Sequence, residues 1–357
     1  MYSESDLQAA VEAGAIPQSA ADALRAHAAS RRASPLVDEE HFRLLTGFND
    51  IFVAIASVIL LIAVGWLGQD LSSSGDHQPS MIAGTLVAAL SWGLAEYFTR
   101  VRRMALPSIL LLLSFAGGVA FAVMAAGMRL APDANERTGA LIASAAALLT
   151  AGAIWLHWRR FMVPITVAAG AAAGAATAIG LLVAVVPGIK DGIIWMILAA
   201  GVAVFACAMW WDMSDRARTT RRSDVAFWLH LTAAPMIAHS LFQLLGALDG
   251  AVSALTALSV VVLYVVFAIV ALAIDRRALL VSSLAYVLWA LSALIRQAGA
   301  VEWSFALTAL LIGSALLLLS AFWHRARKMV VEGLPHTMKA RLPYLDREAG
   351  QPDRVFA

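Results

Sequence analysis

The sequence is poor in charge and in cysteine. Of its 357 residues, 14% are charged, 61% are hydrophobic and one, Cys207, is a cysteine. A soluble domain usually has about a quarter of its residues charged, so the composition argues against a water-soluble core. One cysteine can form neither an internal disulfide framework nor a cysteine-rich zinc or iron–sulfur centre. We therefore expect a membrane protein that carries out no redox chemistry.

Sequence motifs of catalysis are also missing. The chain has no phosphate-binding loop, no His-Glu-x-x-His, no Gly-x-Ser-x-Gly and no pair of carboxylates within an apolar run. We expect a protein that is not an enzyme and that binds no cofactor or metal. A cleavable signal peptide is not expected either, because the first apolar run begins near Ile51, behind a mostly polar segment.

What the sequence does have is a series of apolar runs, which raise the mean hydropathy to +0.78. Most are long enough to cross about 30 Å of hydrocarbon as a helix. Bounded by charges, glycine or proline, they predict ten spans at residues 50–68, 80–98, 105–128, 138–157, 162–186, 191–211, 225–248, 251–274, 278–295 and 303–323. The expected fold class is all-α, a polytopic transmembrane bundle built from helical hairpins.

Arginine and lysine predict how this bundle is oriented, because cytoplasmic loops are enriched in them. Eleven follow the even-numbered spans: Arg100, Arg102, Arg103, Arg159, Arg160, Arg216, Arg218, Arg221, Arg222, Arg276 and Arg277. Four follow the odd-numbered spans: Arg129, Arg137, Lys190 and Arg296. Both termini are therefore expected in the cytoplasm.

The basic turns also suggest an internal repeat. Basic residues recur at Arg103, Arg160, Arg222 and Arg277, in steps of 57, 62 and 55 residues, each about one helical hairpin. Duplication of a hairpin would produce parallel copies. Alternatively, any hairpin bundle needs cations at each inner turn.

The two ends predict separate regions. Residues 1–46 contain a short helix ended by Gly14, a second helix after Pro17, and an amphipathic segment over residues 36–48 that leads into the first span. We expect the bundle to occupy residues 47–324. Residues 325–357 form a basic cytoplasmic tail, which either lies against anionic headgroups or is solvated.

Span seven is the most unusual segment, because ionisable groups at membrane depth are costly and often functional. It contains His230 and His239 with Trp228 and Pro235. On a straight helix the two histidines are roughly 13 Å apart and on nearly opposite faces, but a kink at the proline could change how they face. They are candidate ligand or pathway residues. Alternatively, each bonds a neighbouring helix as a packing device.

Two further features suggest mainly structural roles. Glu96 lies four residues before Arg100, the spacing of a helical ion pair near the inner interface, although it is also a candidate pathway residue. Gly170 and Gly174 have the small-x-x-x-small spacing that lets helices approach closely. That contact could form within the chain or between the subunits of a homo-oligomer.

Three segments carry a resemblance, which covers most of the chain: Asp38-Glu-Glu-His-Phe-Arg-Leu-Leu-Thr-Gly-Phe-Asn-Asp50, Asp224-Val-Ala-Phe-Trp-Leu-His-Leu-Thr-Ala-Ala-Pro235 and Ile274-Asp-Arg-Arg-Ala-Leu-Leu280. Together with the short helical pair, they resemble uncharacterised polytopic proteins of the bacterial inner membrane. The resemblance implies bacterial origin and the same bundle architecture, and it implies no catalytic or binding residue.

Two functions compete at this point. Ten spans, hairpin repeats and the His-Pro-His span favour a transporter or facilitator of a small neutral or lipid-like molecule. The near absence of buried carboxylates argues against an ion pump. The helical pair and the basic tail favour instead a membrane scaffold or regulatory partner that binds a protein through residues 1–46. Under either function the lipid bilayer is an expected partner, a homo-oligomer could form through Gly170 and Gly174, and nucleic acid is not expected.

Overall fold

The computed structural model describes residues 10–24, 48–71, 78–186, 188–216, 218, 220–247, 253–297 and 304–345. The chain divides into two units, Met1–Arg43 and Leu44–Ala357. All regular secondary structure in the described residues is helical. The all-α class is therefore confirmed for this part of the chain.

In the first unit, residues 10–24 form the expected pair of short helical segments. Gly14 ends the first segment with a φ of +69°, and the amide of Ala15 donates to the carbonyl of Ala10 at 2.9 Å. Glycine favours this left-handed termination because it has no Cβ. The second segment follows Pro17, whose carbonyl accepts from the amide of Ala20 at 3.0 Å. The role of residues 1–46 in binding a partner stays a prediction, and nearly all of the amphipathic segment 36–48 lies outside the described residues.

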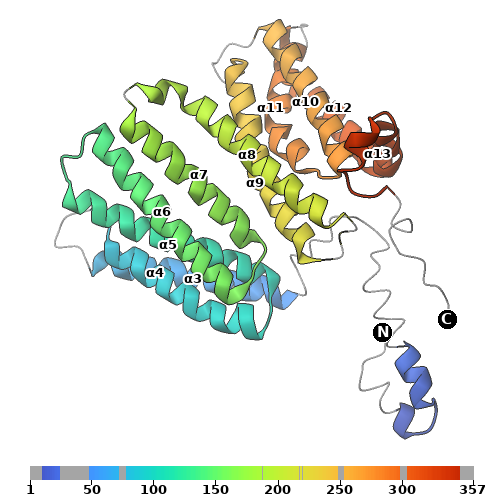
Figure 1. The fold of residues 1–357 in the computed structure, drawn as a ribbon, viewed down its shortest axis with the longest axis horizontal. Coiled ribbons are helices and arrows are strands. Elements are labelled where there is room, and N and C mark those ends of the chain that lie inside the picture. The colour runs from blue at the N-terminus through green and yellow to red at the C-terminus, as the bar shows by residue number, and fades with distance from the viewer. Residues whose placement is uncertain are drawn as a thin grey trace. The chain divides into compact units, whose positions relative to one another are not determined.

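The second unit is a succession of helices. Their bounds are α3 Phe48–Asp70, α4 Met81–Ala95, the π-helix η1 Glu96–Val101, α5 Ala105–Leu130, α6 Glu136–Phe161, α7 Ile165–Val185, the 3₁₀ turn η2 Ile189–Gly192, α8 Ile193–Ser214, α9 Arg221–Leu244, α10 Ala254–Ile274, α11 Ala278–Gln297, α12 Ser304–Ala321, α13 Trp323–Glu332 and α14 His336–Lys339. Figure 1 shows these helices following one another in approximate chain order, from α3 and α4 to α10–α13.

Each predicted span coincides with one of these helices, but not every helix meets the requirements of a membrane crossing. Among the described residues, eight helices are long and apolar enough, namely α3, α4 with η1, and α5 to α10. A ninth is added if α12 and α13, which are bent by 76°, form one span. In α11 the apolar part, Ala278–Ala293, is shorter. The protein is thus a multi-pass integral membrane protein, with eight or nine candidate spans in the part of the chain that the structure describes.

The helices pack as hairpins. The most extensive contacts join α4 to α5, α6 to α7, α8 to α9 and α10 to α11, each pair connected by a short turn. Each of these turns contains one non-glycine residue with a positive φ, namely Arg103, Met162, Arg218 and Asp275, at 53–58°. This conformation is uncommon outside glycine. The recurring basic turns therefore share a backbone feature as well as their charge.

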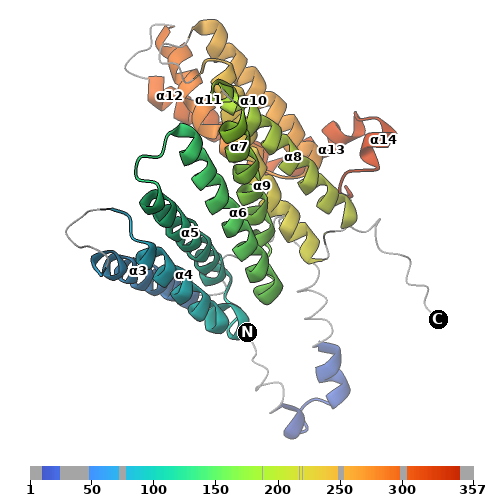
Figure 2. The ribbon, with the colours of Figure 1, turned by 60° about the vertical axis from the view of Figure 1, so that its left-hand side comes forward.

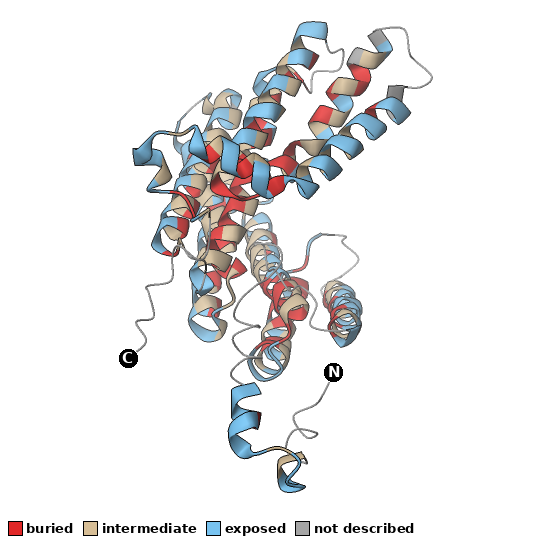
Figure 3. Cartoon of the chain, turned by 90° about the vertical axis from the view of Figure 1, so that its right-hand side faces the viewer, coloured by how far each residue is buried: buried red, intermediate tan, exposed pale blue. Residues whose placement is uncertain are grey.

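Among the full-length candidate spans, α9 has the largest buried share, as expected for a helix surrounded by other helices. About half of its apolar stretch is buried, against a third or less in each of the other seven full-length candidate spans. Figure 3 shows buried segments where helices face one another and exposed segments on their outer faces. Large apolar side chains such as Trp66 and Leu255 are over 70% exposed, as expected where hydrocarbon is the surrounding solvent.

One of the close backbone contacts at the glycines of these helices joins α4 and α5. A Cβ at Gly84 would lie 2.6 Å from the carbonyl oxygen of Gly118, and one at Gly118 would lie 2.8 Å from the amide of Ala88. At Gly174 nothing lies within 4 Å, and at Gly170 the nearest atom is 3.6 Å away, on Ile154. Within the described chain, the tight small-residue contact is therefore not at the predicted pair, whose role between subunits stays a prediction.

This difference gives a matched test of packing. We expect Gly84→Val to destabilise the protein by about 1–3 kcal/mol, because the added methyl groups push α4 and α5 apart. Gly174→Val should have little effect, since its side chain would enter open space. Thermal unfolding of both variants in the same detergent measures this. Equal melting temperatures for the two variants would contradict the described α4–α5 contact.

Candidate functional site

A buried ionic cluster joins the ends of α8, α9 and α10. Asp212, near the end of α8, accepts a hydrogen bond from Nη2 of Arg276 to its Oδ1 at 2.7 Å. Its Oδ2 lies 2.9 Å from Nε2 of His230 on α9. All three side chains are 3% exposed or less. The cluster therefore brings together groups that lie far apart in the sequence and shields them from solvent.

A second carboxylate extends the cluster to α13. Asp275 occupies the left-handed position that ends α10. Its Oδ2 lies 2.7 Å from Nη1 of Arg218, and its Oδ1 accepts from Nε1 of Trp323 at 2.8 Å. Nε of Arg327 is 3.6 Å from the same Oδ1. The turns α8–α9 and α10–α11 are thus held together with the start of α13.

The segment after α13 folds back onto this cluster. Nη2 of Arg327 donates to the carbonyl of Pro343 at 2.9 Å, and Nε of Arg216 donates to the carbonyl of Leu342 at 2.8 Å. The guanidinium of Arg216 also lies 4.2 Å from the ring centre of Tyr344. At least as far as Leu345, the segment predicted to be a basic tail therefore packs against the helices; Figure 2 shows α13 and α14 beside the end of α8.

These contacts hold the ends of α8, α9, α10 and α13 together, and we call this arrangement the tether. Removing a charge from water costs several kcal/mol unless a partner and further hydrogen bonds compensate, and both carboxylates receive guanidinium donors here. Nδ1 of His230 is buried and has no hydrogen-bond partner among the described residues. The arrangement fixes four helix ends and offers no described nucleophile. Within the described residues, no three His, Cys, Asp or Glu side chains gather in a way that could hold a metal ion.

The two histidines predicted as candidate site residues form hydrogen bonds with different helices. His230 bonds Asp212 on α8, whereas Nδ1 of the exposed His239 lies 2.8 Å from the hydroxyl of Tyr286 on α11. Pro235 lies within an unbroken α9, and the half-buried Trp228 packs against the apolar cluster formed by α7, α8 and α9. The histidines are not brought together, and each makes the interhelical bond of the packing alternative. Their functional role remains a prediction.

Glu96 makes the expected contact with Arg100, at 3.4 Å, and a closer one that the sequence spacing did not predict. Its Oε1 lies 2.7 Å from Nε of Arg160. Glu96 and Arg160 are 64 residues apart, as are Asp212 and Arg276. In both pairs a carboxylate near the end of one hairpin's first helix meets an arginine at the next hairpin's turn. The predicted repeat of basic turns is therefore matched by two structural features, the positive φ in each turn and this spacing between carboxylate and arginine.

Sequence reasoning missed most of the cluster: Asp212, Arg218, Asp275, Arg276, Trp323 and Arg327. Arg218 and Arg276 are predicted in cytoplasmic loops and Arg327 in the basic tail, because cations at turns normally serve topology. The sequence signal that was available is an aspartate at each of the two basic turns. Asp212 precedes the α8–α9 turn, and Asp275 lies in the α10–α11 turn. Acid and base at two turns on one side of a bundle can pair across it.

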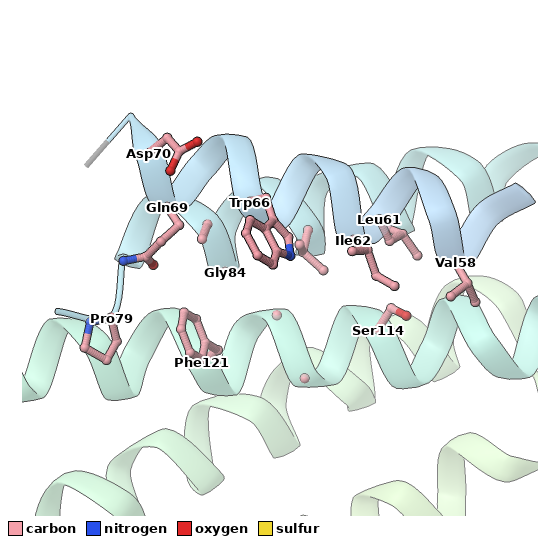
Figure 4. Close-up of a pocket in the computed structure, with 15 residues that line it drawn as sticks. Val58, Leu61, Ile62, Trp66, Gln69, Asp70, Pro79, Gly84, Ser114 and Phe121 are labelled. Atoms are coloured by element: carbon pink, nitrogen blue, oxygen red, sulfur yellow. The ribbon is translucent and has the colours of Figure 1, made fainter. Parts of the chain in front are cut away.

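A groove between α3, α4 and α5 forms a large cavity in the described structure. Its volume is about 1010 Å³. Figure 4 shows Trp66 of α3 and Phe121 of α5 reaching into it from its two sides. Other apolar residues complete its walls: Val58, Leu61, Ile62 and Val87. Its glycines, Gly65, Gly84, Gly117 and Gly118, have no side chain to fill the space.

The end of the groove near the α3–α4 connection is polar and well ordered by hydrogen bonds. Gln69 Nε2 donates to the carbonyl of Gln78 at 2.6 Å, and its Oε1 accepts from the amide of Ser80 at 3.0 Å. The Ser80 hydroxyl caps α4 by accepting from the amide of Ala83 at 3.2 Å and donates to the carbonyl of Gly68 at 2.9 Å. Asp70 lies beside this network and lines the groove.

Comparison with known proteins adds no family. No protein-family model matches the chain, and no curated protein or solved structure shows significant similarity to it. The resemblance to uncharacterised inner-membrane proteins therefore stays a prediction. Arguments about function rest on the groove and the ionic cluster.

The two ion pairs with the same spacing provide a test of the tether. We expect Arg276→Met to destabilise the protein by about 3–5 kcal/mol, because Asp212 is left as a buried charge without its arginine partner. Arg160→Met, at the equivalent exposed pair, should change stability little. Denaturant unfolding in mixed micelles measures both.

A double variant separates charge from packing. Asp212→Leu combined with Arg276→Met removes both charges and should recover part of the stability that Arg276→Met loses. If Arg276→Met and Arg160→Met were equally mild, Asp212 would not be buried as described.

Proposed function

We propose that the protein is a non-enzymatic facilitator that binds a lipid-like amphiphile in the groove between α3, α4 and α5 and assists its movement through the bilayer. The groove is the single observation that carries this proposal. Its walls are apolar, and α3 and α5 present large exposed apolar side chains around it. Such a surface suits an acyl chain better than a hydrated ion or sugar.

The size of the groove supports the same substrate class. Its volume of about 1010 Å³ is at the upper end of the roughly 300–1,000 Å³ of small-molecule pockets. From Val58 to Asp70 the lining of α3 covers twelve residue steps, about 18 Å at about 1.5 Å per residue. This exceeds half of the roughly 30 Å hydrocarbon thickness. The groove can therefore take an acyl chain lengthwise.

The ionic cluster supports a lipid-like substrate rather than an ion. The carboxylates of Asp212 and Asp275 are each paired with arginine and buried, so they are committed to holding helices. The groove lies on other helices, α3 to α5. In this proposal, α3–α5 handle the substrate and the tethered helices α8–α13 act as a fixed frame.

We also propose ten crossings, with both termini in the cytoplasm of a bacterial inner membrane. α11 has 20 residues, about 30 Å as a helix, which is enough to cross. A short turn joins the two helices of each of the four closely packed hairpins, and the sequence concentrates its cations in these turns. Cysteine-accessibility mapping of engineered single cysteines in these turns, with Cys207 replaced by serine, would measure the orientation.

Filling the groove tests the proposed function. A Cβ at Gly117 would meet nothing within 4 Å, so Gly117→Phe can place a ring in the groove without moving backbone. We expect it to lower the amount of lipid retained through purification, and the flux of a fluorescent phospholipid analogue in liposomes, by about tenfold.

Gly174→Phe is the matched control, because Gly174 is also a helical glycine with nothing within 4 Å and does not line the groove. It should retain lipid and flux at the level of the unaltered protein. If Gly117→Phe folds and inserts normally but keeps full lipid binding and flux, the groove is not the route and the proposed function is wrong.

A further inference from the structure

We propose that the occupant of the groove is a membrane phospholipid with an amine-bearing headgroup of zero net charge, such as a phosphatidylethanolamine. Its chains lie along Trp66 and Phe121, and its amine faces Asp70. This inference rests on the proposed function, which requires an amphiphile in the groove, and adds the chemistry of the headgroup.

The charge around the polar end of the groove carries the argument. Of the fifteen described residues that line the groove, Asp70 is the one charged side chain, and none is a lysine or arginine. A headgroup with net negative charge would be repelled here, whereas an ammonium group would be attracted.

The end of α3 at Asp70 acts in the same direction. Asp70 is the last residue of α3, where carbonyl groups without intrahelical partners carry partial negative charge that favours a cation. The nearby start of α4 would favour an anion, but the Ser80 hydroxyl already occupies its Ala83 amide. The side chain of Gln69 is engaged at both its oxygen and its nitrogen. The exposed carboxylate of Asp70 is therefore the charged group best placed to select a headgroup.

The position of the apolar walls makes a bilayer phospholipid the fitting source of the amine. Figure 4 shows Asp70 at one end of α3 and Trp66, Ile62 and Val58 following along the same helix. A headgroup at Asp70 therefore directs its chains along the helix towards the middle of the membrane. The lipid would enter from the leaflet at the Asp70 end of α3.

Titration of the purified full chain with two lipids that differ only in headgroup tests this inference. Native mass spectrometry would follow binding of palmitoyl-oleoyl phosphatidylethanolamine and palmitoyl-oleoyl phosphatidylglycerol. We expect the ethanolamine lipid to bind about two- to fivefold more tightly, the effect of one solvent-exposed ion pair. Asp70→Asn should remove this preference while both lipids still bind, and Asp70→Lys should reverse it.

Controls separate this inference from the proposed function. Asp191→Asn changes an exposed carboxylate at the α7–α8 connection, away from the groove, and should leave the preference unchanged. If Gly117→Phe abolishes binding of both lipids but the unaltered protein prefers neither lipid, or prefers phosphatidylglycerol, the headgroup inference is overturned and the groove stands. If Gly117→Phe affects neither lipid, the proposed function fails and the inference fails with it.

Discussion

The ion pair between Asp212 and Arg276 is the interaction on which the later half of the structure depends. In a bilayer, a helix end can carry a charge inward only if another part of the chain neutralises it. Here Arg276 reaches Asp212 from the α10–α11 turn, and His230 bonds the same carboxylate from α9. The neighbouring Asp275 draws in Arg218 and Trp323. Four helix ends and the following segment are fixed by satisfying two carboxylates.

The helices α3–α5 are organised by a different constraint, the lack of side-chain volume. Because hydrocarbon gives apolar helices no hydrophobic drive to associate, close packing of small residues holds them together. Gly84 and Gly118 let the backbones of α4 and α5 touch, and Gly68 meets Ala83 between α3 and α4. The same small residues cannot fill the space between α3 and α5. The groove is thus a consequence of how these three helices are joined.

The earlier and the later helices differ in what they bury and in what they expose. The later helices bury matched charges and are tied to one another at one end. The earlier helices expose apolar surface around an unfilled groove in which Asp70 is the one charged residue of the described lining. The paired residues Glu96 and Arg160 repeat the spacing of Asp212 and Arg276, but they are partly exposed. The same spacing between carboxylate and arginine therefore occurs twice in the chain, once as a buried ion pair and once as a partly exposed one.

The sequence alone determined that this is a helical membrane protein, where its helices lie and which turns are basic, because hydropathy and charge are local properties of a segment. It also singled out His230 and Glu96, since titratable groups at membrane depth are rare. Tertiary structure alone decided their partners, Asp212 and Arg160, because pairing across helices depends on how distant hairpins pack. The same holds for the groove: Gly117 and Gly174 are both helical glycines in sequence, and only the arrangement of α3, α4 and α5 makes one of them line a cavity.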